Sequence, residues 1–526
     1  MSTTPAAKET GVYTETVEYK ASAPNSVLDA SDVERDSKNA PEPVTLTQED
    51  NDRIRRKTDK RILTILIWIY FLQILDKSVL GLGNVWGLST DTGLKGQDYS
   101  TIASINAIAQ LAWQPFSSYL LVRVPARPLM TGMVFGWGVA ATCMAAAHNF
   151  GGLLATRFLL GLFEAGCLPL FGMLTAQWYR RAEQPSRVAA WYSTNGLATV
   201  FGSLLSWALG HVRSEHIKAW QLIFLIVGII TVLSAPLVWY VLDSDIESAR
   251  FLTPHEKEQA YERLRANNTG TGSHEYKLSQ VWEMVRDPKS WLWLAMSLLL
   301  NIGASVSNAF GPTLLKGFGF DRGTTSLLNI PFGALQFLAI LAASYAAQVW
   351  RRKGAVLALF VIPVIAGLAL LYTQSTATGF KQAPALVGFY LLSALYGGNP
   401  LIVTWMAANT GGQTKKSTIM SLYNAGSAAG NIIGPYLFQS KDAPQYRPGV
   451  KVVMGMFCAL LAVIGMQVVV LFFLNRQRER QRVANGKPKV IKDTSMSAKW
   501  EAQESEGANA GLDLTDFEND EMVYVY

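Results

Sequence analysis

Hydrophobic residues in this chain gather into long runs that are separated by short polar loops. Twelve of these runs come near the length of a membrane-spanning helix, which needs about 20 apolar residues. They cover residues 62–81, 98–121, 129–147, 152–174, 188–209, 220–242, 291–311, 325–348, 355–373, 385–407, 418–438 and 452–474. Because a backbone in lipid must satisfy its own hydrogen bonds, we expect an all-α membrane protein with twelve transmembrane helices.

A hydrophilic segment, residues 243–290, divides these runs six and six. The two halves share a faint internal similarity, in which LLGLFEAG (159–166) of the fourth run aligns with LLSALYGG (391–398) of the tenth. In this register Glu164 is matched by Tyr396. Two six-helix bundles with a binding site near the membrane midplane are typical of secondary transporters.

The boundaries of the parts follow from the same pattern. The N-terminal residues are polar with few large apolar side chains, and such a composition cannot bury enough surface to fold. In the central loop, the capping-box pattern of Thr253 and Glu256 predicts a helix that runs to about Arg265. A second amphipathic segment runs from Leu278 to Arg286. We expect five parts: a disordered cytosolic tail (1–60), an N-terminal six-helix bundle (61–242), a cytosolic central loop with short helices (243–290), a C-terminal six-helix bundle (291–475) and a cytosolic C-terminal tail (476–526).

The Lys and Arg residues are distributed along this chain as they are in helical membrane proteins. The chain is 50% hydrophobic and 16% charged, with a net charge of +7. Lys and Arg gather at both tails and in the loops on the same side, such as Arg180 and Arg181 after the fourth run. Because cytosolic loops carry an excess of Lys and Arg, we expect both termini and the central loop in the cytosol. The basic balance therefore indicates topology rather than nucleic-acid binding, and we expect a monomer in the plasma membrane.

Four charged residues lie inside the predicted spans. Arg157 and Glu164 are seven residues apart in the fourth run, so both fall on one helix face, roughly 10 Å apart along the axis. Asp76 and Lys77 are adjacent in the first run and point about 100° apart, so they cannot both face one cavity. A charge at the bilayer centre costs about 2.5–3.5 kcal/mol, and such residues usually mark a functional pathway.

The second half carries neutral polar groups where the first half carries charge. We expect Asn195, Tyr396 and Asn424 to contribute to substrate binding together with Lys77 and Arg157. Several polar residues of the second to sixth spans, including Asn106, Gln110, Gln114 and Asn195, are also typical of hydrogen bonds between helices.

Several motifs resemble one transporter family over roughly residues 60–475. The most specific is RFLLGLFEAGCLP followed by WYRR-x-E-x-x-x-R, and YFLQILDK, GQDYS and LTPHEKEQAYERLR are further marks, as is DLTDFEN (513–519) near the C-terminus. With these motifs the chain resembles the major facilitator superfamily, specifically the fungal allantoate permease family of anion:cation symporters. The resemblance implies Asp76 and Glu164 as proton carriers and Lys77 and Arg157 as the cations that bind a carboxylate. Relatives commonly have Arg at the position of Lys77, and Lys lacks the planar fork of Arg.

The charges suggest how such a site would work. Asp76, Lys77, Arg157 and Glu164 sum to zero when all are ionised, so the cluster has little reason to attract an anion. Each proton that it takes up frees one cation for a substrate carboxylate. We therefore expect proton-coupled symport of a small organic anion, such as allantoate, another ureide or a vitamin acid, with the proton gradient as the driving force and no cofactor or metal.

Three other interpretations use the same residues. The charges are also compatible with buried ion pairs that only hold the bundle, with an exporter of an acidic metabolite, and with a sensor that binds its ligand without moving it. An enzyme is disfavoured because the sequence has no Walker A loop, no His/Cys metal spacing and no nucleophile elbow.

Overall fold

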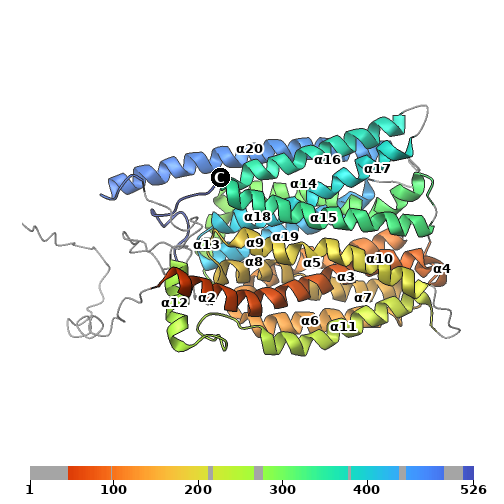
Figure 1. The fold of residues 1–526 in the computed structure, drawn as a ribbon, viewed down its shortest axis with the longest axis horizontal. Coiled ribbons are helices and arrows are strands. Elements are labelled where there is room, and N and C mark those ends of the chain that lie inside the picture. The colour runs from red at the N-terminus through yellow and green to blue at the C-terminus, as the bar shows by residue number, and fades with distance from the viewer. Residues whose placement is uncertain are drawn as a thin grey trace, which may run out of the picture. The chain divides into compact units, whose positions relative to one another are not determined.

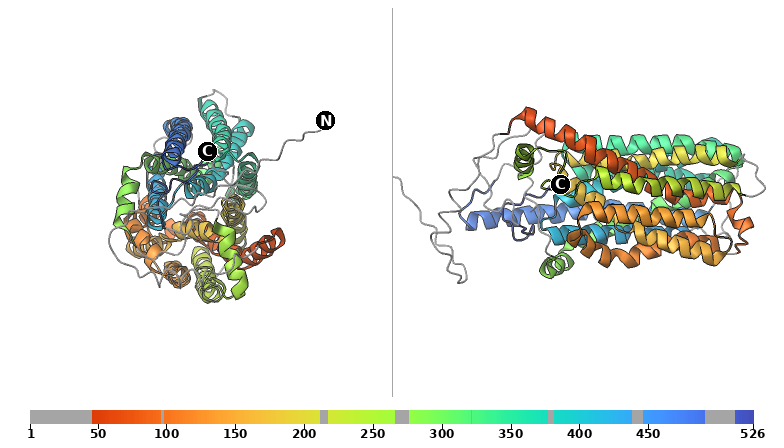
Figure 2. Two further views of the ribbon diagram at one scale, coloured as in Figure 1. Left: turned by 90° about the vertical axis from the view of Figure 1, so that its left-hand side faces the viewer. Right: turned by 90° about the horizontal axis from the view of Figure 1, so that it is seen from below.

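The computed structural model describes most of the chain. The described residues are 46–95, 98–210, 217–265, 276–320, 322–376, 381–437, 446–490 and 513–526. The expected disordered tail up to residue 45 lies outside them. Within residues 46–526 the long helices lie side by side (Figure 1), and the end-on view in Figure 2 places the helices of the N-terminal half on one side and those of the C-terminal half on the other.

Each of the twelve predicted spans coincides with one helix or with a helix in two or three pieces. In the first half these are α3 (Thr64–Val85), α5 (Asp98–Arg123), α6 (Ala126–Met144), α7 (Phe150–Glu164) with α8 (Cys167–Trp178), α9 (Gln184–Tyr192) with α10 (Thr194–Gly210), and α11 (Ala219–Val241). A short helix, α4 (Leu88–Asp91), follows α3. In the second half they are α14 (Pro288–Gly317), α15 (Arg322–Trp350), α16 (Lys353–Thr376), α17 (Gln382–Leu391) with η2 (Leu392–Gly397) and α18 (Gly398–Ala408), α19 (Gln413–Tyr436) and α20 (Arg447–Ala484).

The all-α membrane fold is confirmed over the described residues, which form helices and no strand. Seven helical stretches among them are long and apolar enough, by length and composition, to cross a membrane: Gln48–Asn84, Phe150–Trp178, Ala219–Val241, Leu327–Trp350, Lys353–Gln374, Gln382–Ala408 and Arg447–Ala484. The remaining runs are helical too, but several carry more polar residues. Helix α5, for example, buries Asn106, Gln110 and Gln114.

Both segments of the internal repeat lie where a helix is broken. Helix α7 ends at Glu164 and α8 begins at Cys167, while α17 ends at Leu391 and passes through the 3₁₀ turn η2 into α18. The two breaks fall within the aligned segments LLGLFEAG and LLSALYGG. A broken helix leaves backbone groups that need other partners. At the first break, the carbonyl oxygen of Ala165 accepts hydrogen bonds from Gln114 Nε2 (3.2 Å) and Asn424 Nδ2 (2.9 Å).

The expectation of disorder up to residue 60 is wrong for its last part. Helix α2 (Gln48–Thr58) continues through the π-helical segment η1 (Asp59–Leu63) into α3. Its start is fixed by a capping box, in which Asp50 N donates to Thr47 Oγ1 (3.1 Å) and Thr47 N donates to Asp50 Oδ2 (3.3 Å). Ile54 is buried, and Lys57 pairs with Glu256 (Nζ–Oε1 2.7 Å). The cap, this burial and the ion pair compensate for the polar composition that suggested disorder.

The central loop contains both predicted helices, α12 (Pro254–Arg265) and α13 (Leu278–Arg286). The predicted capping box is present, since Thr253 N donates to Glu256 Oε2 (3.0 Å) and Glu256 N donates to Thr253 Oγ1 (3.3 Å). Arg263 of α12 is buried and forms an ion pair with Glu183, which lies in the turn before α9. This ion pair fixes the central loop to the first bundle at the side that we assign to the cytosol.

The expected orientation predicts which side of the membrane a thiol reagent reaches. In a variant whose three native cysteines are replaced, a single cysteine at His255 of α12 should stay unlabelled by a membrane-impermeant maleimide added to intact cells. A cysteine at Lys218, whose side chain is 63% exposed before α11, is the matched control and should be labelled. The reverse pattern would show that the assigned orientation is inverted.

Candidate functional site

Glu164 lies at the end of α7 and is the most enclosed acid of the four predicted charges, at 1% exposure. Its Oε2 accepts a hydrogen bond from Gln110 Nε2 (3.0 Å) and lies 3.8 Å from Lys77 Nζ. Gln110 Nε2 also donates to Asn106 Oδ1 (2.9 Å), so Asn106 positions the amide that binds the carboxylate. Its other oxygen, Oε1, has no hydrogen-bond partner among the described residues. Helices α5 and α7 come close here because Gly161 faces the Asn106 backbone, where a Cβ would clash.

The ion pair of Lys77 and Glu164 connects an accessible group to an enclosed one. The Lys77 side chain is 41% exposed, whereas that of Glu164 is fully buried. A polar solute that reaches Lys77 is therefore one side chain away from the carboxylate. A change in the protonation of Glu164 would directly change the charge that Lys77 presents to such a solute.

Asp76 points away from this pair, as its angular separation from Lys77 requires. Its Oδ2 accepts hydrogen bonds from Trp137 Nε1 (2.8 Å) of α6 and from Thr231 Oγ1 (3.2 Å) of α11. Its Oδ1 has no hydrogen-bond partner within the described part of the chain. Asp76 thus connects α3 to two neighbouring helices inside the first bundle.

Arg157 is a buried cation for which the described residues offer no partner within bonding distance. The residue is 4% exposed, and its Nε has no hydrogen-bond partner. Among the described residues, no carboxylate oxygen lies within the 4.0 Å of an ion pair with its guanidinium, although the charges of Glu164 and Asp76 act on it from farther away. Leaving the Nε–H group in this state is costly, because burial removes its water without replacing its hydrogen bond.

The three predicted neutral binding residues lie at different places. Asn195 Oδ1 accepts a hydrogen bond from Gln336 Nε2 (2.9 Å), which joins α10 to α15. Asn424 Nδ2 donates to Ala165 O, so it too joins the two halves. Tyr396 is buried in η2 with its ring edge-on to Phe332. All three lie at helix contacts, and their part in substrate binding stays a prediction.

The sequence did not indicate the partners that hold the charges. Trp137 and Thr231 bind Asp76 from helices far along the chain, and no spacing rule links them to it. Around Glu164 the sequence offered one indication. Asn106 and Gln110 are four residues apart, so they share a face of α5. An aromatic cluster beside the site also has no local signature: Tyr70 packs against Trp191 with ring centroids 5.0 Å apart.

Comparisons with known proteins agree on one group of relatives. The family model of the Major Facilitator Superfamily matches residues 66–435. An uncharacterized transporter of Schizosaccharomyces pombe is 31% identical over 473 residues, covering 90% of this chain and 89% of the relative. In Saccharomyces cerevisiae, the thiamine pathway transporter is 29% identical (90% and 86% covered) and allantoate permease is 28% identical (91% and 88% covered). The crystal structure of the human organic anion transporter MFSD10 matches with a TM-score of 0.58 at 15% identity, covering 77% of this chain and 99% of that one, which shows the shared fold.

The contacts of Asp76 predict a measurable stabilisation. Trp137→Phe removes the Nε1 donor and leaves the buried carboxylate undersatisfied, which should lower the free energy of unfolding in detergent by about 1–3 kcal/mol. Trp68→Phe is the matched control, because Trp68 Nε1 donates to Ser234 Oγ (3.0 Å), a neutral group, and its side chain is partly exposed. The control should lose distinctly less stability, and equal losses would contradict a structural role for the Trp137–Asp76 contact.

Proposed function

This chain belongs to the Major Facilitator Superfamily, in the fungal allantoate permease family, and on that basis we propose that it is a proton-coupled symporter of a small organic anion. Its relatives are named as transporters, and the chain is an integral membrane transporter rather than an enzyme. The proposed substrate is a carboxylate such as allantoate, another ureide or a vitamin acid. The proposed location is the plasma membrane, with both termini in the cytosol, and the proposed direction is uptake by a monomer.

The observation that carries this proposal is the state of Arg157. Its guanidinium is buried in a span without a carboxylate within 4.0 Å among the described residues, and its Nε has no hydrogen-bond partner there. A substrate carboxylate supplies what is missing, because it matches the planar guanidinium with two parallel hydrogen bonds. A guanidinium kept only to hold the bundle would be expected to have its partner within the protein.

Glu164 supplies the proposed link to protons. In its ionised form it neutralises Lys77, the accessible cation beside it. When Glu164 takes up a proton, Lys77 loses that partner and its charge becomes available to a substrate anion. Binding of the anion then favours the protonated carboxyl, and binding of the proton favours the anion, since the linkage is reciprocal. Asp76 is the second proposed carrier, and its hydrogen bonds to Trp137 and Thr231 would have to change when it is protonated.

The names of the relatives support the substrate class in part. Allantoate permease of Saccharomyces cerevisiae is named for a carboxylate, which fits a site built around Arg157. The thiamine pathway transporter is not named for an anion, so the names of the relatives do not identify the substrate. We therefore base the substrate class on the buried guanidinium, and a panel of organic acids in uptake assays would identify the molecule.

The substrate proposal predicts a graded effect at Arg157. Arg157→Lys keeps the charge but loses the fork, and it should weaken binding of the transported acid by about tenfold, or ~1.4 kcal/mol. Arg157→Ala should abolish binding, with the amount of protein in the membrane measured as the control. In the wild type, the neutral amide of the same acid should be carried far less well. Equal transport of the acid and the amide would mean that Arg157 does not bind a carboxylate.

The coupling proposal makes a separate prediction at Glu164. Glu164→Gln imitates the permanently protonated group, so it should abolish accumulation against a gradient while exchange of internal for external substrate continues. Radiolabelled uptake and counterflow in the same vesicles measure the two activities. Glu258→Gln is the matched control, because Glu258 is 58% exposed on α12 and should leave both unchanged. Continued accumulation by Glu164→Gln would shift the coupling role to Asp76.

A further inference from the structure

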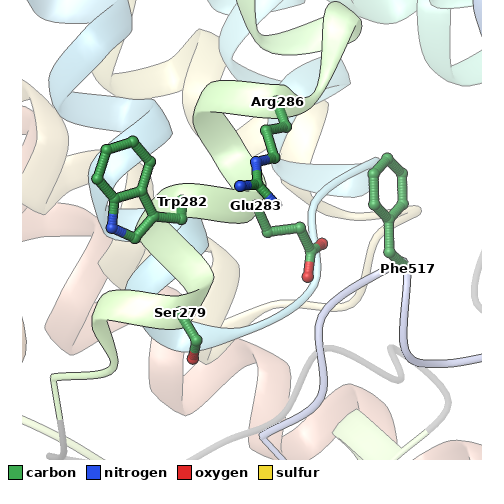
Figure 3. A pocket seen from close by; sticks show the side chains of 5 residues that line it. All are labelled: Ser279, Trp282, Glu283, Arg286 and Phe517. Atoms are coloured by element: carbon green, nitrogen blue, oxygen red, sulfur yellow. The ribbon is translucent and has the colours of Figure 1, made fainter.

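Residues 513–526, which we call the tail segment, are bound in the body of the protein at the end that we assign to the cytosol. Asp516 is fully buried there and forms ion pairs with two buried lysines, Lys289 of α14 and Lys415 of α19 (2.9 Å between Lys415 Nζ and Asp516 Oδ1). Phe517 lines a pocket with Glu283 and Arg286 of α13 (Figure 3). These contacts come from helices far apart in the sequence, so the second bundle and α13 of the central loop together form an acceptor surface for the tail segment.

Hydrogen bonds to the backbone continue this acceptor surface to the last residues. Val525 N donates to Asn409 Oδ1 (2.7 Å), and Trp405 Nε1 donates to Val525 O (2.7 Å). The backbone N–H of Lys353 donates to Tyr526 O (2.7 Å). The tail segment is therefore held along its length by α14, α16, α18 and α19 of the second bundle.

The acceptor surface complements the acidic charge of the tail segment. Arg482 of α20 donates to Asp520 O (Nη1–O 3.0 Å), and Lys487 pairs with Asp520 and Glu521 (2.9 Å each). Burial alone would raise the pKa of Asp516, but the lysine ammonium groups beside it hold that pKa well below its usual range. A lowered pKa stabilises docking at every pH above the ordinary carboxyl value of about 3.9, and this stabilisation is lost only as the pH falls through the lowered pKa. The contribution of Asp516 to docking should therefore not change with the pH of the cytosol.

One contact crosses to the first bundle. Arg181, in the turn between α8 and α9, donates from Nη2 to Met522 Sδ (3.1 Å). Burial, and then the charge of Arg181, lowers the pKa of Lys416 of the second bundle to about 7, while Asp513 and Asp516 of the tail segment act in the opposite sense. The carboxylates of the tail segment thus favour the charged form of Lys416, which burial and Arg181 disfavour.

The two bundles are in direct contact at this same end. Ser118 Oγ of α5 lies 3.1 Å from Thr418 Oγ1 and 3.3 Å from Ser417 Oγ, both of α19. The structure therefore has the bundles together on the side assigned to the cytosol. A transporter that alternates between two openings must separate them there to release its substrate inward.

We propose that the tail segment is a latch on the cytosolic gate, carried by the second bundle and closing on Arg181 of the first. Its many buried contacts with the second bundle remain when the gate opens. The hydrogen bond from Arg181 to Met522 breaks, because it connects parts that separate. The tail segment therefore stabilises the state that is closed toward the cytosol, and this inference does not depend on the identity of the substrate.

A reducible crosslink tests which contact has to break. In the full chain with its native cysteines replaced, Arg181→Cys is paired with Met522→Cys and joined by a short, reducible bifunctional thiol reagent. Crosslinking should stop transport, and reduction should restore it. The matched control joins Asn409→Cys to Val525→Cys, two positions that the proposal keeps together, and its crosslink should leave transport unchanged. Transport before crosslinking shows that each variant is folded.

The outcomes distinguish a tail segment that controls the cytosolic gate from one that is bound without affecting the gate. Undiminished transport by the crosslinked Arg181→Cys/Met522→Cys protein overturns the proposal, as does an equal block by the control crosslink. If the double variant is inactive before crosslinking, Met522→Ala gives an independent measurement. It should raise the labelling rate of Ser118→Cys by a thiol reagent applied from the cytosolic side several-fold. An unchanged labelling rate would equally overturn the latch.

Discussion

The cost of a charge inside the membrane is the constraint on which the rest of this structure depends. Glu164 can be buried because Gln110 donates to it and Lys77 lies beside it, and Asp76 because Trp137 and Thr231 bind it. Arg157 differs from these two acids, since its Nε has no hydrogen-bond partner and no carboxylate oxygen of the described residues lies within 4.0 Å of its guanidinium. We infer that this buried guanidinium is kept for an anion that comes from outside the chain.

The break in the fourth span connects this charge to the contact between the two bundles. Glu164 is the last residue of α7, and the next residue, Ala165, offers a carbonyl oxygen that no regular helix turn satisfies. Gln114 of the first bundle and Asn424 of the second both donate to it. A change at Glu164 therefore acts one residue away from a hydrogen bond between the bundles. In our account this proximity, together with the tail segment at the cytosolic end, is how proton binding and gate opening influence each other.

Local sequence patterns predicted much of the fold. They could not predict the features that depend on contacts between residues far apart in the sequence. The apolar runs located the spans, and the Thr253–Glu256 capping box placed α12, because lipid and helix caps act on neighbouring residues. The polar composition of α2 wrongly predicted disorder, because the contacts of α2 with the loop helix α12 stabilise it as a helix. At the site, the spacing of Arg157 and Glu164 on one helix identified the candidate charges. It gave no sign of the Trp137–Asp76 contact or of the burial of Asp516 between two distant lysines, since no local rule specifies such pairings.

The central claim is that the anion site becomes cationic only when Glu164 carries a proton. It is tested most directly by counting the protons taken up when the transported acid binds to the purified protein. Binding heats measured in buffers of different ionisation enthalpy give this number. The account predicts net proton uptake by the wild type at neutral pH and a smaller uptake by Glu164→Gln, in which only Asp76 can still take up a proton. Tight binding of the acid by the wild type without proton uptake would contradict it.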